Sequence, residues 1–307
     1  MKYGEGPKSN TYELMGLERE DISLIHDKAK AVLREGAFKE TDFIGNPYER
    51  ETVERDIAYV ERERARIAKE SREEDIELRQ LATIFEAIVL ENGELSEWFG
   101  DNAFTLATSE YDDLQGVDMV VEFREGASAS YLGLAADVTF SGSPNSSNGV
   151  GKKFDRLLAR IEKGNLPQVK YFKSQHIPIR GSLQLPEVII GVEKATVLEL
   201  AELWVAKKKR ILETHRVQIM ILEQIRDQIR FFANYARSVK RDRIAAIYEM
   251  RLASVEDILR KKADIARVSR REGREDRVHS QIIEFIKLRQ AGLGSEEATD
   301  VVEDLDE

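Results

Sequence analysis

The chain has 307 residues, a net charge of −10 and no cysteine. The absence of thiols excludes disulfides, thiolate metal sites and cysteine nucleophiles. No segment approaches the ~20 consecutive apolar residues that a membrane-spanning helix needs. The first residues also lack the apolar run of a signal peptide. We therefore expect a cytoplasmic protein with no membrane partner.

Charge and hydropathy divide the chain into four regions. They are a helical N-terminal region at residues 1–74, a core at 75–193, a long helical and partly coiled-coil region at 194–293, and an acidic, disordered tail at 294–307. This division predicts an α/β fold that is mostly helical overall. A mixed-sheet core would carry long helical extensions at both ends.

The N-terminal region has the apolar spacing of two long helices. The first is expected at residues 11–36, where Gly36 acts as a stop, and a loop follows at 37–50. The second runs from about residue 50 to residue 92. Its second half is much more apolar than its first half, so we expect that half to pack on the core.

Short segments rich in β-branched residues follow the second helix. We expect strands at residues 103–109, 117–123, 131–140, 169–172 and 188–192. A turn at 112–116, a polar connection at 124–130, a mobile loop at 141–151 and a helix at 152–163 would link them. This order is typical of an α/β or α+β domain with a mixed sheet.

The C-terminal region contains neither proline nor glycine from residue 194 to residue 271. Extended helices are therefore expected there, with one break near residue 240. Apolar residues at 3/4 spacing from Leu222 to Val239 predict a coiled-coil seam. We expect a homodimer through this seam, and a last short helix at 281–288.

Basic residues are concentrated in the C-terminal helices. Residues 205–293 carry 22 basic and 12 acidic side chains, whereas 294–307 contain seven acids and no base. The basic clusters lie at residues 207–210, 240–243, 260–262 and 270–271. Clusters recurring along helices predict contacts with the phosphates of nucleic acid. The solvated faces of coiled-coil helices would show the same pattern.

Two aspartates lie within otherwise apolar predicted strands. Asp118 belongs to the strand at 117–123, where Val117, Met119 and Val121 should share the opposite face, and Asp137 belongs to the strand at 131–140. A carboxylate in such a strand is costly unless it is paired or binds a metal ion. Oxygen ligands of this kind suit Mg²⁺ or Mn²⁺. The pair therefore predicts a divalent-metal site.

The segments SEYDDLQGVDMVVEF and LGLAADVTF resemble the core of PD-(D/E)XK nucleases, which have the restriction-endonuclease-like fold. The resemblance covers about residues 75–193. That fold runs helix, three strands, helix, strand. An acid on its second strand and a (D/E)-x-K motif on its third bind the metal, and a glutamate on the first helix often assists. Asp118, Asp137 and Glu86 match these three acids.

The resemblance implies a metal-dependent nuclease that hydrolyses phosphodiester bonds of nucleic acid, with DNA as the expected substrate. Mg²⁺ or Mn²⁺ would be held by Asp118, Asp137 and the Val138 carbonyl. Glu86 would hold the water shell of the metal ion or a second ion. DNA would bind along the basic C-terminal helices.

The lysine of the motif is replaced by Thr139. A lysine from elsewhere would have to stabilise the charge that develops on the phosphate. Lys152 and Lys153 begin the next predicted helix, and Lys170 lies on the following strand. These three residues are the candidates.

Two other interpretations stay open. The chain is either a non-enzymatic nucleic-acid-binding or scaffold protein with a degenerate nuclease fold and coiled-coil arms, or an unrelated α+β domain whose acids are structural. In the structural interpretation, Asp118 caps a turn and Asp137 pairs with an arginine. Glu86, Lys152 and Lys153 would then be surface residues.

Overall fold

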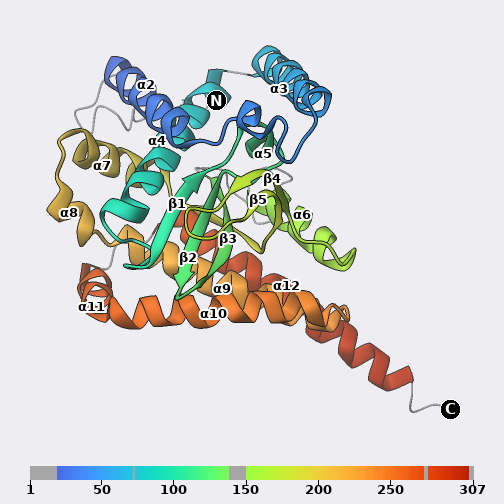
Figure 1. The fold of residues 1–307 in the computed structure, drawn as a ribbon. Coiled ribbons are helices and arrows are strands. Elements are labelled where there is room, and N and C mark those ends of the chain that lie inside the picture. The colour runs from blue at the N-terminus through green and yellow to red at the C-terminus, as the bar shows by residue number, and fades with distance from the viewer. Residues whose placement is uncertain (1–18, 72, 138–149, 273–275, 304–307) are drawn as a thin grey trace, which may run out of the picture.

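The computed structural model of the chain describes residues 19–71, 73–137, 150–272 and 276–303 (Figure 1). Within these ranges the protein is mostly helical and contains a mixed sheet of four strands. The N-terminal elements are α2 (Arg19–Gly36), the 3-10 helix η1 (Glu40–Phe43), α3 (Arg50–Glu70) and α4 (Glu73–Leu95). Gly36 ends α2, as predicted, and residues 11–18 lie outside the description.

The central segment alternates strands and helices. Its elements are β1 (Ala103–Ala107), α5 (Glu110–Leu114), β2 (Met119–Glu125), β3 (Ser128–Asp137), α6 (Val150–Glu162), β4 (Gln168–Lys173), β5 (Arg180–Gln184) and β6 (Glu187–Gly191). The predicted turn at 112–116 is wrong, because helix α5 occupies most of it. The Ser109 hydroxyl caps this helix by accepting a hydrogen bond from the Asp112 amide at 3.2 Å.

Helices follow to the end of the described chain. They are α7 (Lys194–Val205), α8 (Lys209–Glu213), α9 (Val217–Ser238), α10 (Asp242–Lys261), α11 (Ala263–Glu272) and α12 (Arg277–Glu303). The predicted break near residue 240 is confirmed, because Lys240 adopts a φ of 58° between α9 and α10. The predicted helix at 281–288 is longer in the structure. It continues through Glu303 where we expected a disordered tail, in a segment without proline.

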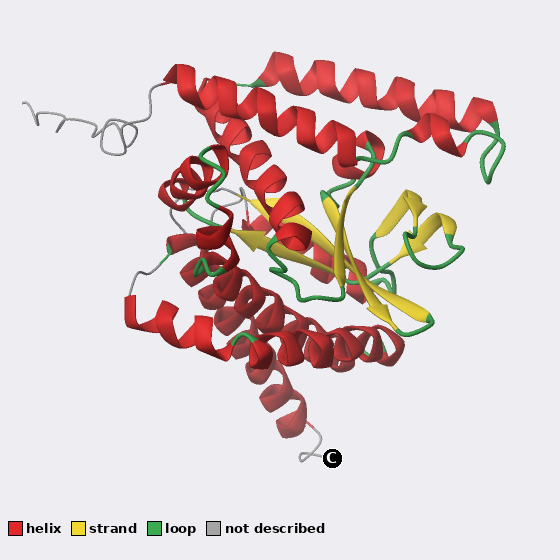
Figure 2. Ribbon diagram, turned by 60° about the vertical axis from the view of Figure 1, so that its left-hand side comes forward, coloured by secondary structure: helices red, strands yellow, loops and turns green. Residues whose placement is uncertain are grey.

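The four-stranded sheet has the order β1-β2-β3-β6. Strand β2 is antiparallel to both β1 and β3, whereas β6 is parallel to β3. Strands β4 and β5 form a separate antiparallel pair. The strand predicted at 169–172 therefore lies outside the main sheet, and its partner β5 was not predicted. Figure 2 shows this pair beside the sheet, with helices above and below.

One hydrophobic cluster connects the N-terminal helices, the central strands and the C-terminal helices. It extends from Ile22 in α2 to Ile286 in α12 and includes Phe85, Val121 and Phe232. The C-terminal helices thus pack on the sheet instead of extending from it as arms. A second cluster contains Val117 and Val120 together with Phe172 of β4. Val117 therefore does not share a face with Val121, because regular pairing of β2 begins only at Met119.

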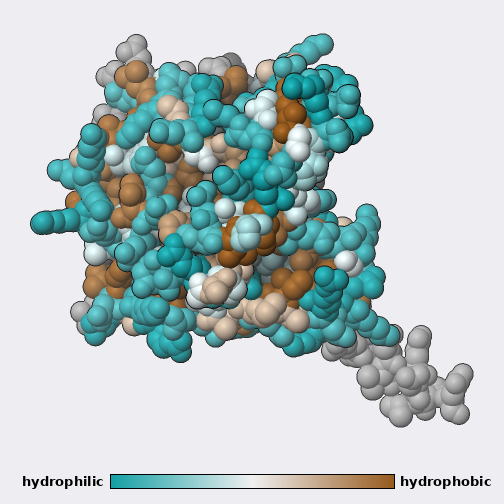
Figure 3. All heavy atoms as spheres, viewed as in Figure 1, coloured by the Kyte–Doolittle hydropathy of each residue, from teal (hydrophilic) through white to brown (hydrophobic). Residues whose placement is uncertain are grey.

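The chain surface is rich in charge. The face in Figure 3 is mainly hydrophilic with scattered apolar groups, in line with a chain in which 34% of residues are charged. None of the described helices is long and apolar enough to cross a membrane.

Helix α9 covers the β6 edge of the sheet with two glutamines. The Gln228 side chain accepts a hydrogen bond from the Ile189 amide at 2.9 Å and donates one to the Ile189 carbonyl at 2.6 Å. Gln224 does the same for Gly191, at 2.9 and 2.8 Å. Both side chains are fully buried. They supply the partners that a fifth strand would otherwise provide to β6.

Replacement of Gln228 by leucine should destabilise the protein. The substitution leaves a buried amide and a buried carbonyl of Ile189 without partners, which should lower the free energy of unfolding by about 2–4 kcal/mol. Urea unfolding followed by circular dichroism measures this loss. Gln290→Leu, at an exposed position of α12, is the control and should change stability by less than ~0.5 kcal/mol. Equal stability of the two variants would contradict the role of Gln228 as a hydrogen-bond partner of β6.

Candidate functional site

A cavity of about 540 Å³ brings together acidic and basic side chains from distant parts of the chain. Its acidic residues include Glu86 of α4, Asp113 of α5 and Asp118 before β2. The basic residues that line it are Lys30, Arg34, Lys39 and Arg64. Two of the sequence-predicted residues, Glu86 and Asp118, therefore share one cavity.

Backbone and side-chain hydrogen bonds fix Asp118 at the start of β2. Its amide donates to the Leu134 carbonyl at 3.0 Å, and its own carbonyl accepts from the Thr108 amide at 3.2 Å. Its side-chain oxygen Oδ2 accepts a hydrogen bond from the Ala136 amide at 2.6 Å. The carboxylate thus lies beside the end of β3 and does not cap the preceding turn.

Asp137 is the residue after Ala136 and the last residue of β3, where its backbone is in register with Gly191 of β6. Its side chain is outside the described part of the structure, as are Val138 and Thr139. The register places Asp137 next to the backbone amide that Asp118 contacts. Asp118 and Asp137 therefore come from neighbouring strands at the same end of the sheet.

Lys153 is the candidate lysine that reaches this end of the sheet. It lies on α6, and its Nζ donates a hydrogen bond to the Ala136 carbonyl at 2.5 Å. Lys152 is exposed on the same helix. Lys170 forms an ion pair with Asp56 and lies among tyrosine rings. Its ammonium is therefore engaged on α3 and not at the carboxylates.

The carboxylates of the cavity disfavour one another's ionisation. Burial raises the pKa of Glu86 well above its usual value, and the charges of Asp118 and Asp113 raise it further, while Lys153 opposes the shift. Burial and then the charge of Asp118 raise the pKa of Asp113 to about 7. Solvent still reaches 44% of the Asp113 side chain, so screening reduces the cost of ionising it. The site is therefore one at which added positive charge would be stabilising.

A buried acid that was not predicted from the sequence connects α6 to the turn before Asp118. Glu187 is fully buried at the start of β6 and accepts hydrogen bonds from Arg156 at 2.9 Å and Arg160 at 3.3 Å. The two arginines also donate to the backbone carbonyls of Gly116 and Gln115, at 3.2 and 3.4 Å. Burial raises the pKa of Glu187 to about 7, although both arginines oppose this. The cluster thus holds the Lys153 helix against the Asp118 turn.

The described side chains do not by themselves form a complete metal site. No group of three histidine, aspartate or glutamate side chains with the geometry to hold a metal ion occurs among them. That set does not include the Asp137 side chain or any part of Val138, which are predicted ligands. The carboxylates of Asp118, Glu86 and Asp113 nevertheless have the oxygen chemistry that Mg²⁺ and Mn²⁺ prefer.

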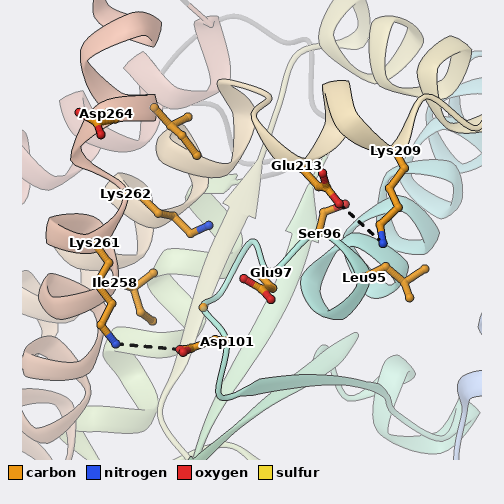
Figure 4. A pocket seen from close by; sticks show the side chains of 12 residues that line it. Leu95, Ser96, Glu97, Asp101, Lys209, Glu213, Ile258, Lys261, Lys262 and Asp264 are labelled. Carbon is orange, nitrogen blue, oxygen red and sulfur yellow. Dashed lines mark ion pairs between the residues drawn. The ribbon is translucent and has the colours of Figure 1, made fainter.

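A second cavity, of about 560 Å³, lies between α4, α8 and the junction of α10 with α11 (Figure 4). Two of its lysines form ion pairs, one between elements and one within helix α8. Lys261 is 4.0 Å from Asp101, and Lys209 is 3.6 Å from Glu213. None of the residues predicted as catalytic lines this cavity. It is therefore a weaker candidate for the active site.

Comparisons of the chain with known protein families, curated proteins and solved structures found no match in any of the three. The assignment of a function therefore depends on the residues of the site.

The raised pKa of Asp113 predicts a pH-dependent effect of the Asp113→Asn substitution. The native state keeps the proton up to a pH of about 7, whereas the unfolded chain loses it near pH ~3.9. The native state thus binds more protons between these values, so this group makes stability fall as the pH rises. Asn removes that loss and should stabilise the protein more at pH 8 than at pH 4.

Unfolding free energies of the wild type and Asp113→Asn, measured from pH 4 to pH 8, test this. Asp264→Asn, at a side chain that is 91% exposed, is the control and should give a nearly constant difference. A constant difference for Asp113→Asn as well would show that its ionisation costs nothing in the native state.

Proposed function

We propose that the protein is a metal-dependent nuclease of the PD-(D/E)XK type that hydrolyses phosphodiester bonds of nucleic acid. The observation that carries this proposal is the convergence of Asp118, Glu86 and Lys153 at one end of the sheet. Their elements follow the chain order helix α4, strand β1, the five-residue helix α5, strands β2 and β3, helix α6 and, after the β4–β5 pair, strand β6. Without α5 and the β4–β5 pair this is helix, three strands, helix, strand. The same order characterises the nuclease fold.

The electrostatics of the cavity favour a divalent cation. Desolvation and the charge of Asp118 raise the pKa values of Glu86 and Asp113, and a bound cation would relieve the repulsion between these carboxylates. Asp118, Asp137 and the Val138 carbonyl are the proposed ligands. When bound, Mg²⁺ or Mn²⁺ would polarise the phosphate and lower the pKa of a water molecule.

The protein side chains would orient the substrate and stabilise charge. Asp118 is fixed by the Ala136 amide, so it needs little rearrangement to bind. Lys153 already contacts the neighbouring Ala136 carbonyl, and a short movement would place its ammonium on a phosphate oxygen. Lys153 thus takes the role of the lysine that Thr139 replaces. Glu86 would hold water molecules around the cation.

A non-enzymatic, nucleic-acid-binding version of the same fold is the second candidate. It is favoured by the hydrogen bonds that Asp118 and Lys153 already make with the backbone of Ala136, which are structural roles in their own right. In that case the cavity would bind nucleic acid without cleaving it.

A cleavage assay distinguishes the two candidates. Labelled single-stranded and duplex DNA and RNA are incubated with the protein in Mg²⁺, Mn²⁺ or EDTA. We expect cleavage only with metal, a loss of at least ~100-fold in Asp118→Asn, and a loss of about 10²–10³-fold in Lys153→Met. Lys152→Met is the matched control and should retain wild-type activity because Lys152 is exposed.

Thermal unfolding with and without Mn²⁺ provides a second readout. Binding to the native state should raise the melting temperature of the wild type but not that of Asp118→Asn. Metal stabilisation without cleavage would support the binding protein. If neither cleavage nor metal stabilisation is observed, the acids have structural roles only.

A further inference from the structure

We propose that Lys30, Arg34 and Lys39 bind the sugar–phosphate backbone of the nucleic acid next to the cleaved bond. This inference rests on the proposed function and deepens it. It moves the substrate contacts from the basic C-terminal helices, where the sequence pattern predicts them, to helix α2 and the segment that follows it.

The first support is position. All three cations line the cavity that contains Glu86, Asp113 and Asp118. A nucleic-acid strand whose scissile phosphate lies at these carboxylates brings its adjacent phosphates to the same cavity. Those phosphates need cations close by, because acidic side chains repel a polyanion.

The second support is availability. Arg34 and Lys39 are exposed, and neither has an ion pair within the part of the chain that the structure describes. Lys30 pairs with Asp27 at 2.7 Å, but 65% of the Asp27 side chain is exposed. A solvent-exposed pair of this kind is worth little, so a phosphate can replace the carboxylate.

Arg64 of α3 has a different role in the same cavity. Its guanidinium lies 3.5 Å from Glu110 and 4.0 Å from Asp113. It therefore offsets part of the acidic charge of the site when no substrate is present. The variant described below keeps Arg64, because its loss would also change the ionisation of the carboxylates.

Several cations of the C-terminal helices already have protein partners. The pairs are Lys209–Glu213, Lys261–Asp257, Arg270–Glu223, Lys262 with the Gln218 side chain and Arg241 with the Glu162 carbonyl. All three of these lysines line the second cavity, away from the predicted catalytic residues (Figure 4). Exposed pairs are as weak here as at Lys30, so position is the deciding difference: none of these five cations lines the cavity that contains the carboxylates.

The test compares two triple variants with the same residue types. One is Lys30→Gln/Arg34→Gln/Lys39→Gln, and the matched control is Lys208→Gln/Lys240→Gln/Arg243→Gln, at exposed positions of the C-terminal region. Binding of fluorescein-labelled single-stranded and duplex DNA is measured by anisotropy between 50 and 300 mM KCl. Ca²⁺ replaces Mg²⁺ to prevent turnover.

We expect the first variant to bind more weakly and to show a shallower salt dependence. Each lost phosphate contact should reduce the slope of log K against log salt by about 0.7–0.9, so three contacts give about 2–3. The control should keep the wild-type slope and affinity. Circular dichroism confirms that both variants are folded.

The outcomes separate this inference from the proposed function. If the first variant keeps wild-type binding, or the control loses as much, the inference is overturned even when cleavage is found. If no protein binds either DNA, it is overturned as well. If the first variant alone loses binding but the wild type never cleaves, the three cations bind the nucleic-acid backbone and only the nuclease proposal fails.

Discussion

The parallel pairing of β3 with β6 is the constraint on which the site depends. Parallel neighbours cannot be joined by a tight turn, so the chain must leave the sheet and return. The connection from Asp137 to Glu187 contains α6 and the β4–β5 pair. It carries Lys153 back to the end of β3 and places Arg156 beside the turn before Asp118. Chain topology thus brings together residues that are far apart in sequence.

The buried acid at the start of β6 and the acids of the cavity differ in their exposure and in the cations around them. At β6 the acid Glu187 is fully buried and pairs with two arginines, which oppose the rise of its pKa that burial causes. At the cavity, Glu86 and Asp113 lie near a third acid, and Arg64, which lies 4.0 Å from Asp113, is 51% exposed. A buried acid paired with two arginines serves the structure, whereas a group of acids that raise one another's pKa beside a cavity is typical of functional sites.

Helix phase and strand composition were sufficient to predict much of the local structure. The end of α2 at Gly36 and the break near Lys240 agree with the sequence, as do β1, β2, β3 and β6 to within a few residues. Strand β5, with the sequence RGSLQ, has too few apolar residues to be recognised, because its stability comes from pairing with β4.

The candidate site was predictable only in part. Strand order indicated that Asp118 and Asp137 lie close together. The phase of α6 favours Lys153 over Lys152, because Lys153 lies four residues before the buried Leu157. The arginine contacts of Glu187, by contrast, depend on the crossover geometry, which leaves no local pattern.

The glutamines of α9 have a consequence for how the chain can be divided. Because their amides complete β6, a fragment that ends after Gly191 would expose an unpaired strand edge, a surface prone to aggregation. The smallest unit in which the β6 edge is paired therefore extends at least through α9, to Ser238.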